Sequence, residues 1–246
     1  MAFTSDLTID EVLLIEEVGF EPVELVMGSS YFHIGWQPTL WNTNMELGDV
    51  TAMMTNARYL ALERMVQHAV GASADGVVGV RLEVEREGHN AEFTVIGTAV
   101  RRRGDDRARW RQNGDRPFTC DLSGGDFWAL VRAGFRPVAF AFGVCVYHVA
   151  HQSLGQWFSS VGQNCEMPQF TQGLYDAREL AMGRMQASAL AAGASAGLVG
   201  VSVDEGSHGW GHVIEMIAIG TGVAPIVDES HETHAPPRVI LGAQDL

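Results

Sequence analysis

The chain repeats one pattern of apolar and polar positions. From Asn56 to Met65 and from Asp176 to Met185, six of ten residues are identical without a gap. In both stretches the apolar residues recur at the three- and four-residue spacing of one helix face. The first face is formed by Leu60, Leu62, Met65, Val66 and Ala69, and the second by Leu180, Met182, Met185 and Ala189. We therefore predict one long amphipathic helix in each half of the chain.

A shorter helix and a strand are predicted ahead of each long helix. Thr8 and Glu11 have the three-residue spacing of a capping box, as do Ser123 and Asp126. Each short helix stops at a glycine followed by phenylalanine, and a proline two residues further on excludes more helix. Residues 23–34 and 138–149 then have the composition of strands. A glycine inside each strand, Gly28 or Gly143, predicts a β-bulge.

Two more strands follow each long helix, beginning at Val77 and at Leu198. The last strand of each half contains Ile-Gly-Thr, at residues 96–98 and 219–221. Each half therefore has the order α-β-α-β-β and ends in a hairpin. Near-identical signals in two copies favour an α+β fold of two tandem units, each a helix layer on a small antiparallel sheet. We place the repeats at residues 1–103 and 119–225.

The segments outside the two repeats differ from them in composition. Residues 104–118 form an Arg-rich linker, and seven of the 16 arginines lie between Arg101 and Arg116. Three aspartates interrupt this basic run, so we expect a solvated linker that pairs with acidic groups nearby. Residues 226–246 form a flexible or docking tail. Its apolar end, Val239–Leu241, would add a strand to the sheet of a neighbour or of an unknown protein partner.

Charge and composition exclude several classes of function. The net charge of −14 argues against broad binding to nucleic acid or anionic membranes. Every basic residue is arginine, which excludes Schiff-base lysine chemistry and the phosphate-loop lysine. We find neither a membrane-spanning apolar stretch nor a secretory signal, so we expect a cytoplasmic protein. The three cysteines have no CxxC spacing, and Cys145 lies in an apolar strand where we expect a buried, inert thiol.

The repeated residues resemble the YbjQ family (UPF0145), which carries a heavy-metal-binding label. The resemblance rests on the Ala-Arg pairs at 57–58 and 177–178, the methionines at 65 and 185, the Gly-Ala-Ser-Ala turns, and the Val-Gly and Gly-Thr motifs of the later strands. It covers both halves but not the linker or the tail. It implies a dodecin-like β-α-β-β core in each unit and a pentameric ring of units. Between the first strand and the long helix, neither copy has the Asn-containing turn and Arg- and Gly-rich loop expected of the family.

Matched histidines give a separate hypothesis, a divalent metal site. His33 and His148 occupy equivalent places in the first strands, and His89 and His212 equivalent places at the start of the last strands. If these strands are neighbours, each repeat brings two imidazoles together. Cys145 lies three residues before His148, and Glu92 matches Glu215. Imidazole, thiolate and carboxylate are ligands for soft or borderline metals. Strand histidines beside a subunit contact would give the same pattern.

Other repeated or clustered side chains suggest contacts between subunits. The variable segments between first strand and long helix carry the aromatic residues Trp36, Trp41, Trp157 and Phe158. Arg58 and Arg178 recur on the long helices, where ion pairing at a subunit contact or binding of an anionic ligand would use them. We therefore expect these six residues at oligomer contacts.

The leading hypothesis is a non-enzymatic module that forms a ring-shaped homo-oligomer with a structural or small-ligand-binding role. The first alternative is a heavy-metal-binding protein that uses the matched histidines. The second is an enzyme with its site at a subunit interface. The sequence has no GxSxG motif, no Cys–His signature and no phosphate loop. The absence of these motifs argues against the enzyme hypothesis relative to the other two.

Overall fold

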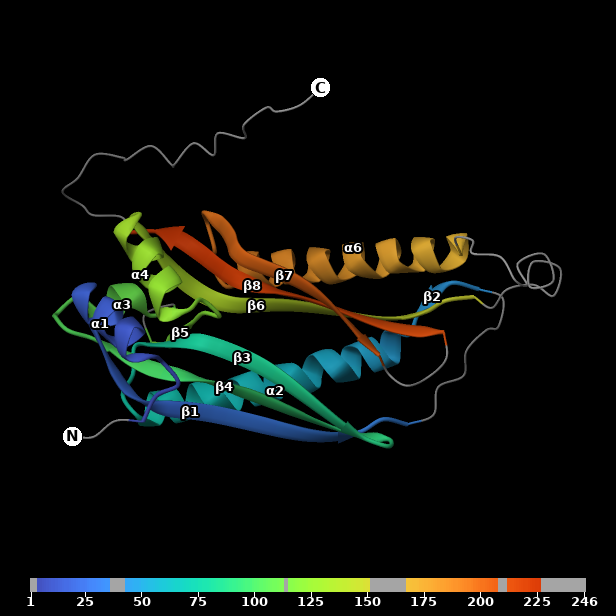
Figure 1. Ribbon diagram of the computed structural model, residues 1–246, viewed down its shortest axis with the longest axis horizontal. Coiled ribbons are helices and arrows are strands. Elements are labelled where there is room, and N and C mark those ends of the chain that lie inside the picture. The colour runs from blue at the N-terminus through green and yellow to red at the C-terminus, as the bar shows by residue number, and fades with distance from the viewer. Residues whose placement is uncertain (1–3, 36–42, 113–114, 151–166, 208–211, 227–246) are drawn as a thin grey trace, which may run out of the picture.

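The computed structural model describes residues 4–35, 43–112, 115–150, 167–207 and 212–226 (Figure 1). Each half has the predicted order of elements. The first repeat consists of α1 (Ile9–Glu17), β1 (Phe20–His33), α2 (Gly48–Gly71), β3 (Gly76–Glu87) and β4 (Asn90–Arg102). The second repeat consists of α4 (Gly124–Arg132), β6 (Phe135–His148), α6 (Pro168–Ala191), β7 (Gly197–Ser207) and β8 (Val213–Pro225). The α+β class and the tandem arrangement are confirmed.

Each repeat forms one four-stranded sheet, which consists of three long strands of that repeat and one short strand from outside them. Sheet 1 has the order β1-β4-β3-β5 and sheet 2 the order β2-β6-β8-β7. The three main strands of each sheet are antiparallel. β5 (Phe118–Thr119) pairs with β3 in parallel. β2 (Met45–Glu46) precedes α2 in the chain but pairs with β6 of the other repeat, so the two repeats are interlocked.

Local capping signals begin both short helices, with the predicted full capping box at α1 and half of it at α4, where the Ser123 hydroxyl accepts from the Asp126 N–H at 3.1 Å. The Thr8 hydroxyl accepts from the Glu11 N–H, and the Glu11 carboxylate accepts from the Thr8 N–H at 2.8 Å. Gly19 and Gly134 end α1 and α4 with φ of +81° and +85°, a conformation that costs a glycine little. These turns send the chain directly into the first strand of each repeat.

The glycines inside the first strands have a different role from the predicted one. The bulges lie earlier, between Pro22 and Glu24 and between Pro137 and Ala139. A Cβ on Gly28 would lie 2.3 Å from the Ala61 carbonyl oxygen, and one on Gly143 would lie 2.0 Å from that of Ala181. The bulge prediction is therefore wrong at both positions, because these glycines instead let each long helix approach its sheet closely.

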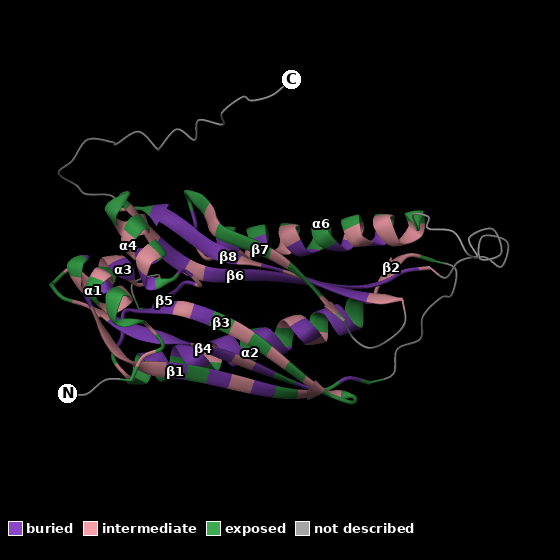
Figure 2. Ribbon diagram, in the orientation of Figure 1, coloured by how far each residue is buried: buried purple, intermediate pink, exposed green. Residues whose placement is uncertain are grey.

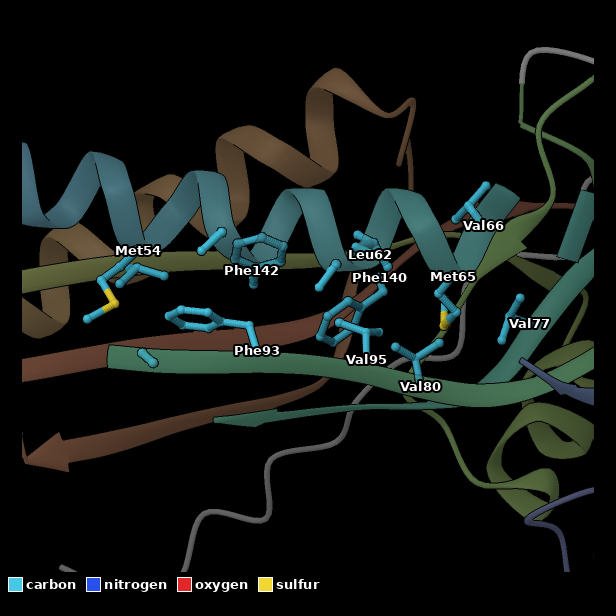
Figure 3. Close-up of a cluster of buried hydrophobic side chains, with 14 of the residues drawn as sticks. Met54, Leu62, Met65, Val66, Val77, Val80, Phe93, Val95, Phe140 and Phe142 are labelled. Atoms are coloured by element: carbon cyan, nitrogen blue, oxygen red, sulfur yellow. The ribbon is translucent and has the colours of Figure 1, made fainter. Parts of the chain in front are cut away.

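The elements stack as four layers, in the order sheet 1, α2, sheet 2, α6 (Figure 1). The largest apolar cluster joins α2 to both sheets: Met54, Leu62 and Val66 of the helix lie with Phe93 and Val95 of sheet 1 and with Phe140 and Phe142 of sheet 2 (Figure 3). A second cluster joins the other face of sheet 2 to α6. Among the residues that the structure describes, α2 is thus covered on two sides, whereas α6 is covered on one.

The linker between the repeats packs into a third apolar cluster. It contains α3 (Arg107–Trp110), whose Trp110 ring meets the Phe20 ring edge-on at 4.8 Å. Arg107 and Arg111 both pair with the fully buried carboxylate of Asp75 at 2.8 Å. The expected pairing with acidic groups is confirmed, but the linker is not simply solvated because Trp110 is buried.

Candidate functional site

The contact between the two repeats is built around a buried ion cluster. Arg58 on α2 donates to the Glu215 carboxylate on β8 at 2.6 Å, and Arg86 on β3 donates to the other oxygen of Glu215. The side chains of Arg58 and Glu215 are only 2% and 3% exposed. The Arg58 guanidinium also donates to the Met54 carbonyl and lies 4.9 Å from the centre of the Phe93 ring. The cluster therefore ties α2 and β3 of the first repeat to the second repeat.

Burial and charge act in opposite directions on this cluster. Burial lowers the pKa of Arg58, while the charge of Glu215 raises it and offsets part of the effect. The net pKa is lowered, but an arginine pKa starts so high that the group stays charged at neutral pH. Two guanidinium groups share one carboxylate, so Glu215 is the residue on which the electrostatic balance depends.

Aromatic packing and backbone hydrogen bonds extend the same contact. The Tyr59 ring on α2 lies 4.5 Å from the Phe142 ring on β6. The Val146 N–H donates to the Thr51 hydroxyl at 2.9 Å, and the Val146 carbonyl accepts from the Leu47 N–H at 2.8 Å. The start of α2 is therefore held on the backbone of β6, beside the two-residue pairing of β2.

A second ion pair joins α6 to β2. Arg184 on α6 pairs with Glu46 on β2 at 2.8 Å and donates to the Val144 carbonyl at 2.8 Å. Burial raises the pKa of Glu46, but hydrogen bonds from Arg184 and Thr51 outweigh it, so the pKa is lowered overall. A hollow of about 380 Å³ lies between α2 and β6, lined by Asn56, Tyr59 and Arg184 among others.

The candidate metal ligands are brought together in part. The first and last strands of each repeat are neighbours as expected, and the His33 and His89 rings lie 6.2 Å apart. His33 Nδ1 lies 3.0 Å from the Asn90 amide oxygen. In the second repeat His148 is buried with Nδ1 3.2 Å from the Thr43 carbonyl, and the His212 ring contacts Phe170 at 5.3 Å.

The five candidate ligands do not converge on one point. Cys145 packs in the apolar cluster beneath α6, whereas His148, three residues further along the same strand, points to the opposite face. Within the described part of the chain, no group of three or more His, Cys, Asp or Glu side chains is placed to hold a metal ion. Burial raises the pKa of the Cys145 thiol to about 12, which fits the inert thiol expected there.

The candidate contact residues divide into three groups. Trp36, Trp41, Trp157 and Phe158 lie outside the described residues. Arg58 makes its contact within the chain, through Glu215. Arg178, its counterpart on α6, is exposed. The sequence analysis did not predict Arg86 as a partner of Glu215 or Glu46 as a partner of Arg184. For Glu215, the one sequence signal of a functional role was its match to Glu92 in the other repeat.

The fold and the repeat contact define a class of small α+β units duplicated in tandem, and sequence comparisons agree with it. The family described as "Putative heavy-metal-binding" (YbjQ) matches residues 43–103 and 144–225. The chain belongs to this family. Among the described residues, no helix has the length and apolar composition needed to span a membrane.

Individual relatives match most of the chain or about a quarter of it. The chain is 46% identical over 226 residues to the encapsulin nanocompartment protein Rv1762c of Mycobacterium tuberculosis, and the match covers 90% of this chain and 86% of the relative. UPF0145 proteins of Vibrio campbellii and Halorubrum lacusprofundi are 41% and 42% identical over 58 and 59 residues. Those matches cover 23% and 24% of this chain, and 55% and 57% of the two relatives.

Proposed function

We propose that this protein is a non-enzymatic assembly module that forms a ring-shaped homo-oligomer in the cytoplasm and serves as a structural component of a protein compartment. The observation that carries the proposal is the contact between the repeats. It joins two copies of one kind of unit through a buried ion cluster, aromatic packing and a shared strand. A surface that binds a second copy of the same unit is the basic requirement for assembly.

The long relative from Mycobacterium tuberculosis supports the second half of the proposal. It is named as an encapsulin nanocompartment protein, and the match extends over 90% of the present chain. The resemblance to the YbjQ family adds the expectation of a five-membered ring. The hollow between α2 and β6 is the place where such a module would take a small ligand.

Native mass spectrometry of the untagged protein tests the proposal. We expect one dominant species whose mass is a multiple of the 26.7 kDa chain. Five chains would supply ten units, which is enough for two of the five-unit rings implied by the resemblance. A dominant 26.7 kDa species across the micromolar range would refute the assembly role.

A metal-binding function is the second candidate, favoured by the His33–His89 pair and by the description of the family. Elemental analysis after dialysis should then detect stoichiometric divalent metal. The metal should be lost in a His33→Ala/His89→Ala variant and retained in a His68→Ala variant, whose imidazole lies on α2. Metal that is absent from the wild type, or that survives in the double variant, would exclude these histidines as the site.

A further inference from the structure

The matching strand registers define which residues of the two repeats are equivalent. β1 pairs with β4 as β6 pairs with β8, with a bulge after the same proline in each case. Glu92 is the cross-strand partner of Tyr31, and Glu215 is the cross-strand partner of Val146. Glu92 in sheet 1 is therefore equivalent to Glu215 in sheet 2. The gapless helix match makes Arg178 the equivalent of Arg58. The second repeat therefore holds a second copy of the arginine, and the first repeat a second copy of the glutamate.

The face of sheet 2 that carries Glu215 is covered by α2, but in the described part of the chain nothing covers the same face of sheet 1. β6 is buried along almost its whole length, whereas β1 alternates between buried and exposed residues (Figure 2). Met27 and Tyr31, which stand where Phe142 and Val146 stand in sheet 2, are 51% and 62% exposed. Glu92 lies on the same bare face and is exposed.

The outward side of α6 is also left uncovered by the segments that the structure describes. Arg178 is exposed on it, in contrast to the buried Arg58 of α2, and Tyr175 is 62% exposed one turn earlier. The edges of the sheets differ too, since β2 covers the edge of β6 while β1 has no strand on that side among the described residues. The contact between the repeats joins a helix face that carries an arginine to a sheet face that carries a glutamate. Each chain exposes a second helix face of this kind, on α6, and a second sheet face of this kind, on sheet 1.

We propose that α6 of one chain packs on the outer face of sheet 1 of a second copy, with Arg178 paired to the partner's Glu92. This inference rests on the proposed assembly role and names the contact that would perform it. The occupant is a second copy because the two bare faces are the equivalents of two faces that already fit each other within the chain. The exposed charges are also complementary, a guanidinium on one face and a carboxylate on the other.

Such a contact is head-to-tail, because it joins two different faces. Every added chain brings a new bare α6 and a new bare sheet 1. A head-to-tail contact generates a ring where the rotation between chains closes and a filament where it does not. Successive units then continue the stacking of sheet and helix layers that the single chain begins.

The contact between chains is weaker than the contact within the chain. Met27 replaces the Phe142 ring, and Glu179 replaces the Tyr59 ring that packs against it. Ser207 stands at the position of Arg86, so one guanidinium balances one carboxylate instead of two sharing it. The assembly therefore dissociates on dilution while each chain keeps its two repeats together.

Charge exchange tests the contact. Arg178→Glu and Glu92→Arg should each weaken association by about 30-fold or more in the dissociation constant, because each brings two like charges together. The Arg178→Glu/Glu92→Arg double variant should recover assembly. Asp105→Arg, a charge reversal in the turn before α3, is the control and should leave assembly unchanged. Masses are followed by analytical ultracentrifugation over a dilution series, and circular dichroism checks that each variant is folded.

A mixture of the two single variants gives a sharper result. The α6 of an Arg178→Glu chain carries a new carboxylate, which is matched only by the new guanidinium on sheet 1 of a Glu92→Arg chain. The reverse contact between the two variants keeps the wild-type pair of Arg178 and Glu92, whereas two chains of the same variant repel each other. The two variants must therefore alternate, so every closed species in the mixture must contain an even number of chains, and a ring of five chains cannot close. A contact between identical faces would show no such rule.

The outcomes separate this contact from the assembly role itself. A wild-type protein that stays at 26.7 kDa refutes both. A wild-type oligomer that neither single variant weakens, or that the double variant fails to restore, refutes the Arg178–Glu92 contact and leaves the assembly role in place. As a check that does not depend on charge, Met27→Cys and Glu179→Cys in one Cys165→Ser chain should crosslink neighbouring chains with a short bismaleimide. Crosslinks confined to single chains would also refute the contact.

Discussion

Replacing Glu215 with glutamine should destabilise the folded chain far more than an ordinary loss of charge. The amide keeps the shape of the carboxylate, so no cavity forms, but it removes the negative charge that Arg58 and Arg86 share. Arg86 is 24% exposed and can turn towards water, whereas Arg58 is enclosed by Met54 and Phe93 and cannot. Removing one partner of a buried ion pair typically costs about 3–5 kcal/mol, against about 0–1 kcal/mol at the surface.

Urea unfolding followed by circular dichroism measures this cost. With a slope of about 3 kcal/mol/M, the midpoint should fall by about 1 to 1.7 M. Glu17→Gln, the same chemical change at an exposed position of α1, is the control and should change stability by less than about 0.5 kcal/mol. The joint replacement Arg58→Met/Glu215→Met should recover most of the loss, since no unpaired charge then stays buried at position 58. Equal midpoints for Glu215→Gln and Glu17→Gln would refute the account of the cluster.

Two further predictions concern the second repeat. Gly143→Ala should destabilise the chain by about 1–3 kcal/mol or more because the new methyl meets the Ala181 carbonyl. Gly183→Ala, with open space at its Cβ, should stabilise α6 by about 0.5–1 kcal/mol. Thermal unfolding measures both variants, and a change of the melting temperature in the same direction for both would contradict this reasoning. Burial raises the pKa of Asp121, so the folded state loses stability as the pH rises from the ordinary aspartate pKa to the raised one. Asp121→Asn, which keeps an acceptor for the Thr221 hydroxyl, should therefore be more stable than the wild type at pH 7 and indistinguishable from it below about pH 4 in urea titrations.

The order of elements was predictable because its signals are local. A capping box at Thr8, a glycine with positive φ at Gly19 and a 3.6-residue periodicity each act over a few residues, and each occurs twice. The position of a glycine in a strand is less informative, since a bulge and a close approach of a helix require the same residue. Gly28 was misassigned for that reason, and only the distance to α2 decides between the two roles.

The repeat contact was not predictable because it depends on partners far away in the chain. Arg58 and Arg178 lie in almost identical local sequence, yet the first is buried and the second is exposed. The difference comes from Glu215, 157 residues from Arg58. No local pattern distinguishes a helix face covered by another sheet from one that faces solvent. The approach of His33 to His89 depended only on neighbouring strands, and that part was predictable.

The double coverage of α2 has a consequence for synthesis on the ribosome. α2 ends at Gly71, but β6, which covers its second side, ends at His148, 77 residues later. At about 5–20 residues per second, the ribosome needs roughly 4–15 s to make the covering strand. Throughout that time the Leu62 and Val66 side of the helix lacks its cover, next to a guanidinium that still lacks Glu215. The nascent first repeat therefore passes through an interval in which it depends on chaperones or on speed of translation to avoid aggregation.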